Sequence, residues 1–553
     1  MTPADPSESA GQGPATGGPG DARAPGEAGT PGLLLAAGLA GAGTMVVELA
    51  AVRLLAPWFG TSQAVWTSVI GVVLLALALG YAGGARLAAR GPSAALQRAL
   101  RGGLLVAALW VAMLPLLASL VSGLLVPRVT ALDEAPGLAL WGSLAAALVL
   151  FLPPAALLGV VSPLVAELLS RRTGESAGTV GGRVLTYSTL GSLLGVFGTT
   201  HVLIARFGLP WTFGIAALLL GASGLLVGAR AGAALAGLLA LAGVGLLRAP
   251  ERPLPGGARL LAEVQSPYQG LRVLERGEGD DRFRWLAVNE ASDSFQSVWS
   301  PRPGLLGGGH YYDGFALPPA WGLAEGPRDS WRMLALGLGA GTSVRVLEGC
   351  LEGSAELDWA GVELDPAVVD LGATWFDLDV AGGRVTRGDA RLALRSQPMG
   401  TFDHVVVDCY ANNMEVPPHL ATLEFFQEVA QRLVPGGWIS VNAGGFGVED
   451  PVVQALGSTL AVALGGRVLA LEVPFSRNVA LIARLDKSLA APGTEGWRAV
   501  ASFAEPLVQG WGAPGTWGWI MGAEELLTDD HAPLEALQRE SVTAGRRRWG
   551  ARP

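Results

Sequence analysis

The chain has 553 residues, of which 50% are hydrophobic and only 15% charged, and its formal net charge is −9. Soluble domains carry about 25% charged residues, so an ordinary soluble enzyme is excluded, and the apolar content also excludes disorder over most of the chain. The acidic excess lies in the C-terminal half, which argues against a nucleic-acid partner because nucleic acid requires basic surface.

Residues 1–31 are rich in Gly, Pro and Ala without apolar periodicity, so we predict a disordered tail rather than a signal peptide. Residues 32–248 consist of long apolar runs, and a bilayer-spanning helix needs about 20 such residues. The candidate spans are 33–55, 64–85, 103–126, 138–169, 184–205, 209–229 and 231–247. The fourth contains Pro153-Pro154 and is expected to be kinked or broken, and the seventh is short. We therefore predict a transmembrane helical domain of six or seven spans.

Arginines after the even-numbered spans give the predicted orientation. They are Arg86, Arg90, Arg98 and Arg101 after the second span, Arg171, Arg172 and Arg183 after the fourth, and Arg230 after the sixth. Cytoplasmic loops carry such an excess, so the even-numbered spans are expected to end in the cytoplasm. Six spans then place the second half in the cytoplasm, and seven place it outside. We expect a multi-pass protein of the cell membrane with a cytoplasmic second half.

Glu48 is an ionisable residue within the first span. Such a residue is a functional candidate by default, and the alternative is a structural polar contact between helices. Arg53 lies five residues further on, and it is expected to extend to the interface.

The second half shows the pattern of an α/β fold. Residues 249–258 form a Pro/Gly-rich linker, and strand-like segments at 260–264, 271–275 and 284–288 predict a small β-rich subdomain over 259–330. Short apolar strands then alternate with helical stretches, which predicts a mostly parallel sheet in a Rossmann-like domain over 331–535. These strands are expected at 333–337, 358–363, 384–386, 404–408 and 437–442. Residues 536–553 are expected to form a basic tail.

A glycine turn and two acidic residues follow successive strands of this predicted sheet. Gly337, Gly339 and Gly341 follow the first strand, where glycines let the backbone approach a nucleotide. Glu363 ends the next strand and is placed to accept hydrogen bonds from ribose hydroxyls. Asp389 ends the third and is placed to accept from an adenine amino group. Each acid alone is more often a helix cap, but together they predict a nucleoside site.

Asp408 ends a fourth apolar strand, 404–408. Ligands bind at the carboxyl ends of the strands in open α/β sheets. A partly desolvated carboxylate there can hold an ammonium group and take its proton. A helix cap is the alternative, because a helix is expected to begin near 417–420.

At these motifs the chain resembles a known family. Residues 260–535 resemble the spermidine synthase family of aminopropyltransferases, which implies a methyltransferase-type Rossmann-like domain. Residues 32–250 resemble the multi-span, facilitator-transporter-like segment of membrane-fused spermidine-synthase-like proteins. The resemblance is carried by Ser266-Pro-Tyr268-Gln269, Gln296-Ser297, the glycine turn, Val362-Glu363-Leu-Asp365, Gly388-Asp389-Ala390, Asp408 and Leu527-Thr-Asp-Asp530.

The resemblance also implies roles for individual residues. Gln269, Gly337, Gly339, Gly341, Glu363, Asp365, Asp389 and Ala390 are implied to bind the nucleoside co-substrate. Asp408 is implied to be the catalytic base, and Tyr311, Asp313 and Tyr410 are implied to bind the amine.

Two carboxylates of the family pattern are missing. Ala340 replaces an Asp in the glycine turn that binds the aminopropyl amine, and Ala411, followed by Asn412 and Asn413, replaces an Asp three residues after the base. These departures leave the donor and the acceptor open.

Three functions remain after these observations. The first is a membrane-anchored aminopropyltransferase that uses decarboxylated S-adenosylmethionine and an amine such as putrescine. The second is a methyltransferase that uses S-adenosylmethionine on a hydrophobic substrate. The third is a transporter or sensor with a nucleoside-binding domain. The expected partners are a small-molecule amine and the lipid bilayer, with no metal and no nucleic acid, and the resemblance also implies a homodimer as an option.

Overall fold

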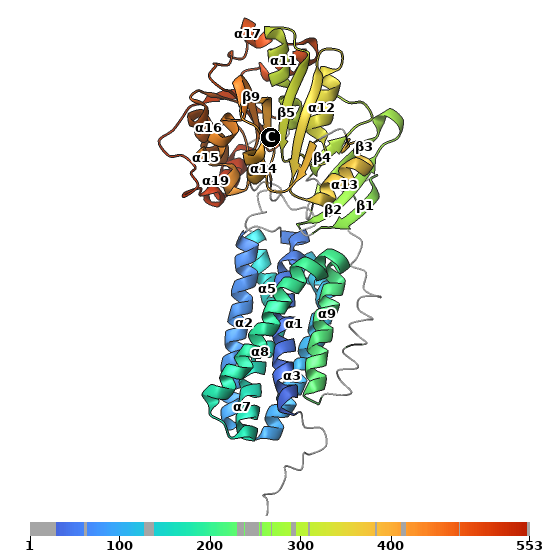
Figure 1. Ribbon diagram of the computed structural model, residues 1–553, viewed down its shortest axis with the longest axis vertical. Coiled ribbons are helices and arrows are strands. Elements are labelled where there is room, and N and C mark those ends of the chain that lie inside the picture. Colours follow the sequence, from blue (N-terminus) through green and yellow to red (C-terminus); the bar gives the residue numbers. More distant parts are fainter. Residues whose placement is uncertain are drawn as a thin grey trace, which may run out of the picture.

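The computed structural model describes residues 29–549 except for 60–62, 126–137, 267, 289–294, 308–309, 382–383, 411–415, 475 and most of 229–256. Most of the predicted N-terminal tail and linker, the seventh candidate span, Arg230, and Ala411, Asn412 and Asn413 lie outside the described residues. Figure 1 shows a helical bundle next to an α/β part that contains both sheets.

The bundle consists of long helices with one broken member. Its elements are α1 (Thr30–Phe59), α2 (Gln63–Arg90), α3 (Ser93–Leu125), η1 (Leu138–Gly142), α5 (Ser143–Leu150), α6 (Leu152–Gly159), α7 (Val161–Thr173), α8 (Ala177–Gly198), η2 (Thr199–Leu203) and α9 (Ile204–Leu226). The expected break in the fourth span is present, because α5, α6 and α7 are separated at Phe151 and Val160, on either side of Pro153-Pro154.

Five helices in the described part of the chain are long and apolar enough to cross a membrane. They are Thr30–Ala56, Val65–Arg90, Ser93–Leu125, Leu152–Thr173 and Arg206–Leu226. The predicted fifth span corresponds to α8, which is not among the five because it is rich in Gly, Ser and Thr and contains Arg183.

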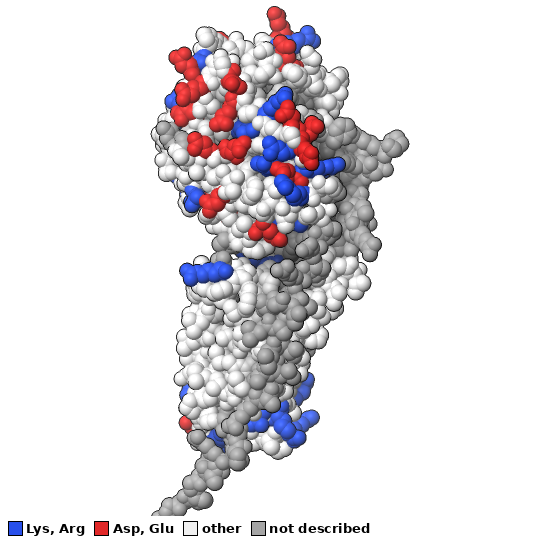
Figure 2. All heavy atoms as spheres, turned by 90° about the vertical axis from the view of Figure 1, so that its right-hand side faces the viewer, with Lys and Arg blue, Asp and Glu red and all other residues white. Residues whose placement is uncertain are grey.

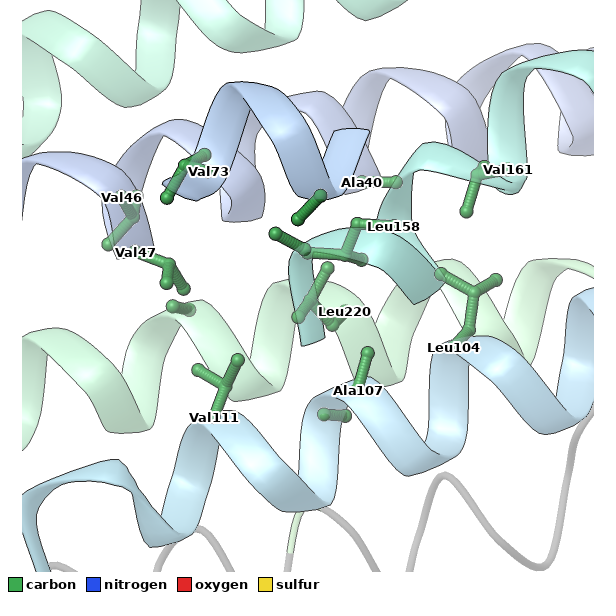
Figure 3. Close-up of a cluster of buried hydrophobic side chains, with 14 of the residues drawn as sticks. Ala40, Val46, Val47, Val73, Leu104, Ala107, Val111, Leu158, Val161 and Leu220 are labelled. Carbon is green, nitrogen blue, oxygen red and sulfur yellow. The ribbon is translucent and has the colours of Figure 1, made fainter. Parts of the chain in front are cut away.

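Small residues let the bundle helices pack closely. A Cβ at Gly191 would collide with the backbone of Gly38, and one at Gly80 would collide with the carbonyl oxygen of Ala156. Such contacts are typical of helix packing in membranes. The interior is filled by aliphatic side chains such as those shown in Figure 3. Leucines also face outward, including Leu194, which is 74% exposed.

The arginine-rich end of the bundle lies away from the α/β part. Figure 2 shows basic side chains at that end and an almost uncharged flank above it. The Arg171 guanidinium donates hydrogen bonds to Gly91 O and Ala88 O (2.8 Å each), which ties α7 to the turn between α2 and α3. Arg101 Nε donates to Val227 O at 2.6 Å, so α9 also ends there.

The α/β part meets the opposite end of the bundle, where Arg53 of α1 contacts Ser266. The chain therefore leaves α9 at the arginine-rich end and enters the α/β part at the other. A chain that crosses a membrane six times would return to the side on which its first span started. The expectation that six spans place the second half beside the arginine-rich turns does not fit this arrangement.

The α/β part contains two sheets. The smaller is antiparallel, in the order β1 (Arg259–Gln265), β2 (Gly270–Arg276), β3 (Phe283–Val288) and β4 (Phe295–Trp299). The larger has the order β12-β10-β11-β9-β8-β5-β6-β7. Its strands are β5 (Ser330–Leu336), β6 (Glu356–Glu363), β7 (Arg384–Arg387), β8 (Phe402–Val407), β9 (Leu433–Gly444), β10 (Val468–Glu472), β11 (Asn478–Arg484) and β12 (Trp517–Ile520).

Strands β5 to β9 are parallel, and β10, β11 and β12 add antiparallel pairs at one edge. The predicted Rossmann-like domain with a small β subdomain is therefore confirmed. The strand order reverses between β5 and β8, and ligands of open α/β sheets bind at the carboxyl ends of the strands beside such a reversal.

Helices cover both faces of the larger sheet. They are α11 (Leu317–Glu325), α12 (Thr342–Leu351), α13 (Pro366–Trp375), α14 (Ala390–Ser396), α15 (Leu423–Ala430), α16 (Pro451–Leu464), α17 (Glu495–Arg498), α18 (Glu505–Trp511) and α19 (Leu534–Trp549). The predicted boundary between the Rossmann-like domain and a basic tail at 535–536 falls inside α19. Ser541 on this helix donates a buried hydrogen bond to Asp450 Oδ2 at 2.5 Å, so α19 is docked on the domain.

Candidate active site

The glycine turn joins the carboxyl ends of three strands. The backbone N–H groups of Gly337 and Leu338 both donate to Val362 O of β6, at 3.0 and 2.9 Å. Gly337 has a φ of +81°, and a Cβ there would collide with the backbone oxygen of Asp408. Only glycine fits this position without strain, because other residues disfavour this φ and would clash. The turn therefore brings β5, β6 and the residue after β8 together.

Glu363 faces the glycine turn from the end of β6. Its Oε2 accepts the N–H of Gly339 at 2.9 Å and its Oε1 accepts the N–H of Asp365 at 3.0 Å. Burial raises the pKa of this carboxyl group, although the same N–H donors act against that rise. A carboxylate accepts about four hydrogen bonds, so these two contacts leave capacity for a ligand hydroxyl. The placement fits the predicted contact with a ribose.

The turn between β1 and β2 carries Gln269 beside this site. Ser266 Oγ donates to Asp365 Oδ2 at 2.5 Å and accepts the N–H of Gln269 at 2.9 Å. Gln269 Nε2 in turn donates to Gln296 Oε1 at 3.4 Å. Asp365 Oδ1 accepts the N–H of Ala367 at the start of α13. Both oxygens of Asp365 therefore hold the protein scaffold, and its expected contact with the co-substrate stays a prediction.

Asp389 caps the next helix of the site. Its Oδ1 accepts the N–H groups of Arg391 and Leu392 at 3.0 Å each, at the start of α14, and its Oδ2 lies 2.9 Å from His419 Nε2. Burial alone would raise the pKa of Asp389, but the N–H donors and His419 lower it overall. Ala390 is buried directly after this cap. The helix-cap alternative thus applies to Asp389, and its Oδ2 meets His419 rather than the backbone.

Asp408 has two side-chain donors. Tyr311 donates its hydroxyl to Asp408 Oδ2, and Asn442 Nδ2 donates to Asp408 Oδ1, each at 2.9 Å. Burial raises the pKa of Asp408 to about 6, against the opposing effect of these two hydrogen bonds. Tyr410 donates its hydroxyl to the backbone oxygen of Asn442 at 2.8 Å. Asp408, Tyr311 and Tyr410 are therefore brought together, as expected, and the cap alternative for Asp408 is not observed.

Asp313 was expected beside the amine site, and in the structure its carboxylate binds the backbone of a loop. It is 3% exposed, and its two oxygens accept the N–H groups of Leu306 and Gly307 at 2.8 Å each. Its neighbour Tyr312 stacks on Tyr311 and donates to Gln296 O at 2.7 Å. Asp313 therefore holds a loop, and the aromatic pair forms the wall beside Asp408.

Asn442 is the site residue that sequence reasoning missed. Val441 of β9 pairs with Val407 of β8, so the parallel register places Asn442 level with Asp408. Its side chain is 4% exposed, and its Oδ1 is buried without a hydrogen-bond partner among the described residues. A polar residue within the apolar strand 437–442 was the available signal.

Ala340 does not supply a substitute for the carboxylate missing from the glycine turn. It is fully buried in an apolar cluster with Leu271, Val368 and Leu371. Its backbone N–H donates to Ser297 Oγ at 2.8 Å, which joins the turn to β4. The side-chain position is thus occupied by packing rather than by an acceptor for an amine.

Comparison with known proteins gives one curated relative with a matching sequence. The chain is 28% identical over 307 residues to a probable polyamine aminopropyl transferase from Bifidobacterium longum (strain NCC 2705). The match covers 50% of this chain and 66% of that protein, slightly less than two thirds of its length. It confirms the resemblance to spermidine-synthase-like proteins. No family model matches the chain.

Solved structures of similar proteins cover about half of the chain. A probable spermidine synthase from Corynebacterium glutamicum ATCC 13032 is 17% identical with a TM-score of 0.38, covering 51% of this chain and 100% of that one. Spermidine synthase from Thermotoga maritima is 14% identical with a TM-score of 0.33, covering 51% of this chain and 87% of that one.

Proposed function

We propose that this chain is an aminopropyltransferase that moves an aminopropyl group from decarboxylated S-adenosylmethionine to a small amine such as putrescine. The observation that carries the proposal is the half-buried Asp408 carboxylate at the switch between β5 and β8, held by Tyr311 and Asn442. The sequence similarity to a probable polyamine aminopropyl transferase supports the same reaction.

The nucleoside of the donor would lie along the carboxyl ends of β5, β6 and β7. Glu363 is placed to accept from the ribose hydroxyls, and Asp389 is placed at the adenine end. The glycine turn allows close approach to the methylene and sulfur atoms. Gln269 closes the site from the turn between β1 and β2.

The proposed reaction is a displacement at carbon. The lone pair of the acceptor amine attacks the methylene carbon bonded to the sulfonium sulfur. A C–N bond forms, the C–S bond breaks, and its electron pair leaves on sulfur as a neutral thioether. Asp408 accepts the proton of the amine, and the protein otherwise contributes by holding the two reactants in line.

Asn442 and Tyr311 orient the base for this step. Both donate to the charged form of Asp408, so both favour the carboxylate over the acid. The unpartnered Oδ1 of Asn442 adds an acceptor next to Asp408, which suits an ammonium group with three donors. This neutral acceptor would take over part of the role of the carboxylates missing at Ala340 and Ala411.

We propose further that the helical half lies in the cell membrane. Its long apolar helices, small-residue contacts and outward leucines suit a lipid environment. The transfer reaction requires the α/β half to face the cytoplasm, where the charged donor is made.

A second candidate is a methyltransferase that uses S-adenosylmethionine. The buried Ala340 favours it, because the aminopropyl amine of the decarboxylated donor loses its expected carboxylate partner. Asp408 is compatible with both reactions, since each requires removal of a proton from a nucleophile.

A product assay on the purified full-length chain tests the proposal. With decarboxylated S-adenosylmethionine and putrescine, we expect methylthioadenosine and an aminopropylated amine in equal amounts by mass spectrometry. Asp408→Asn is expected to lower kcat by about 10²- to 10⁴-fold. Asp281→Asn, on an exposed turn before β3, is the matched control. Methyl transfer from S-adenosylmethionine instead would support the second candidate, and nucleoside binding without turnover would support a sensor.

A further inference from the structure

Arg53 connects the helical half to the proposed nucleoside site. It lies in the last turns of α1, and its Nη1 donates a hydrogen bond to the backbone oxygen of Ser266 at 3.1 Å. The two residues are 213 positions apart in the sequence. Figure 1 shows β1 and β2, which flank Ser266, at the side of the α/β part that faces the bundle.

Ser266 is the centre of the turn that presents Gln269. Its Oγ accepts the N–H groups of Tyr268 (3.1 Å) and Gln269 (2.9 Å) and donates to Asp365 Oδ2. Asp365 in turn caps α13 and donates its N–H to Glu363. A contact at Ser266 therefore acts directly on Gln269 and, through Asp365, on Glu363.

The charge of Arg53 also acts on this turn. Asp365 is 1% exposed, and burial raises the pKa of its carboxyl group, while the charge of Arg53 and the hydrogen bonds to the carboxylate oppose part of that rise. Arginine is well matched to this position because its planar guanidinium stays charged and has five N–H donors. It can therefore donate to a carbonyl oxygen while its charge attracts a nearby carboxylate.

We propose that Arg53 is a positioning residue for nucleoside binding, which couples the packing of the first helix to the Ser266–Gln269 turn. The inference rests on the proposed nucleoside site and assigns the helical half a part in it. A movement of α1 that withdraws Arg53 would release the turn and lower nucleoside affinity. Because coupling between two sites is reciprocal, nucleoside binding must also tighten the end of α1 against the turn.

The test uses full-length protein and two measurements. Titration calorimetry gives the affinity for decarboxylated S-adenosylmethionine, and hydrogen exchange gives the protection of residues 264–276 and 48–59. Loss of one charge-assisted hydrogen bond predicts about tenfold weaker binding by Arg53→Gln and faster exchange at Tyr268 and Gln269. Arg53→Lys keeps the charge and is expected to recover part of the affinity. In the parent chain, bound nucleoside is expected to increase the protection of residues 48–59.

Arg90→Gln is the matched control, because Arg90 is exposed at the opposite end of the bundle. The inference is overturned if Arg53→Gln binds as tightly as the parent with unchanged exchange over 264–276, or if Arg90→Gln loses as much affinity. A parent chain that binds no nucleoside contradicts the proposed function instead. In that case, exchange of the ligand-free variants still shows whether Arg53 holds the turn.

Discussion

Asp408 determines how the proposed reaction depends on pH. Its pKa is raised to about 6 by burial, and only its ionised form can accept a proton from the amine. Activity is therefore present above this pKa and lost as the pH falls through it. We expect kcat/KM to fall about tenfold per pH unit below pH 6 in a profile measured from pH 5 to 8. An acid limb near pH 4, the ordinary value for a carboxyl group, would contradict this role.

Asn442 is expected to set the position of that acid limb. Its amide donates to the charged form of Asp408, so Asn442→Ala removes a contact that favours the carboxylate. The pKa of Asp408 then rises, and the acid limb should move up by about one pH unit. A variant with lower activity but an unmoved limb would show that Asn442 acts in some other way.

The site residues differ in how far the sequence alone could reveal them. Glu363, Asp389 and Asp408 follow short apolar strands, and the parallel arrangement then brings their strand ends to one edge of the sheet. Asn442 was missed because the register between β8 and β9 is a long-range property. The sequence could not show the loop N–H groups that bind Asp313, because they become its partners only in the folded chain.

Among the connecting elements, the turn after β5 depends most on one residue. Gly337→Ala would place a Cβ against the backbone oxygen of Asp408 at a positive φ. We expect a loss of about 1–3 kcal/mol in stability, and a Tm lower by several degrees in thermal unfolding of the full chain. Gly326→Ala is the control, because its φ of 162° is extended and no atom lies within 4 Å of the added Cβ. Equal Tm values for the two variants would contradict the proposed tight contact.

The strands of the parallel sheet were the easiest elements to predict. Their continuous apolar runs are typical of strands buried on both faces. The antiparallel edge formed by β10, β11 and β12 was not predicted. β12 has only four residues, Trp517–Ile520, and its pairing with β10 is specified by tertiary contacts. β4 has the polar residues Gln296 and Ser297 at its centre, so its sequence does not show the apolar pattern of a strand.

The arrangement of the two halves gives a prediction about the membrane. The α/β part and the arginine-rich turns lie at opposite ends of the bundle, so the proposed membrane location places them on opposite sides of the bilayer. In intact cells, an impermeant maleimide is expected to label only one of Ser93→Cys and Ser354→Cys. Ser93 is exposed at the start of α3, and Ser354 is exposed on the turn after α12. The parent chain is the control, since Cys350 is buried and Cys409 is half-buried.

The position that is labelled shows which half of the protein faces the cytoplasm, and the proposed reaction depends on this. The positive-inside rule favours arginine-rich turns in the cytoplasm, whereas transfer from a donor made in the cell requires the α/β half there. Labelling of Ser354→Cys from outside would contradict the transfer reaction as proposed. Labelling of both positions would contradict the arrangement of the bundle.

The sequence could orient the arginine-rich turns but could not show which end of the bundle the α/β half meets. That choice rests on contacts such as Arg53 to Ser266, between residues far apart in the chain. Gly, Ser and Thr lower the hydropathy of α8, so it does not count among the five helices apolar enough to cross a membrane, and the number of spans stays a prediction. Such residues occur both at helix contacts inside membranes and in helices exposed to water, so composition alone does not distinguish the two kinds of helix.

The most direct measurement is a parallel calorimetric titration of the full-length chain with decarboxylated and intact S-adenosylmethionine. The proposed function predicts tighter binding of the decarboxylated form and weaker binding of both forms by Glu363→Gln, which alters the ribose contact. Preference for the intact form would contradict aminopropyl transfer and favour methyl transfer. Absence of binding by either compound would contradict the nucleoside site itself.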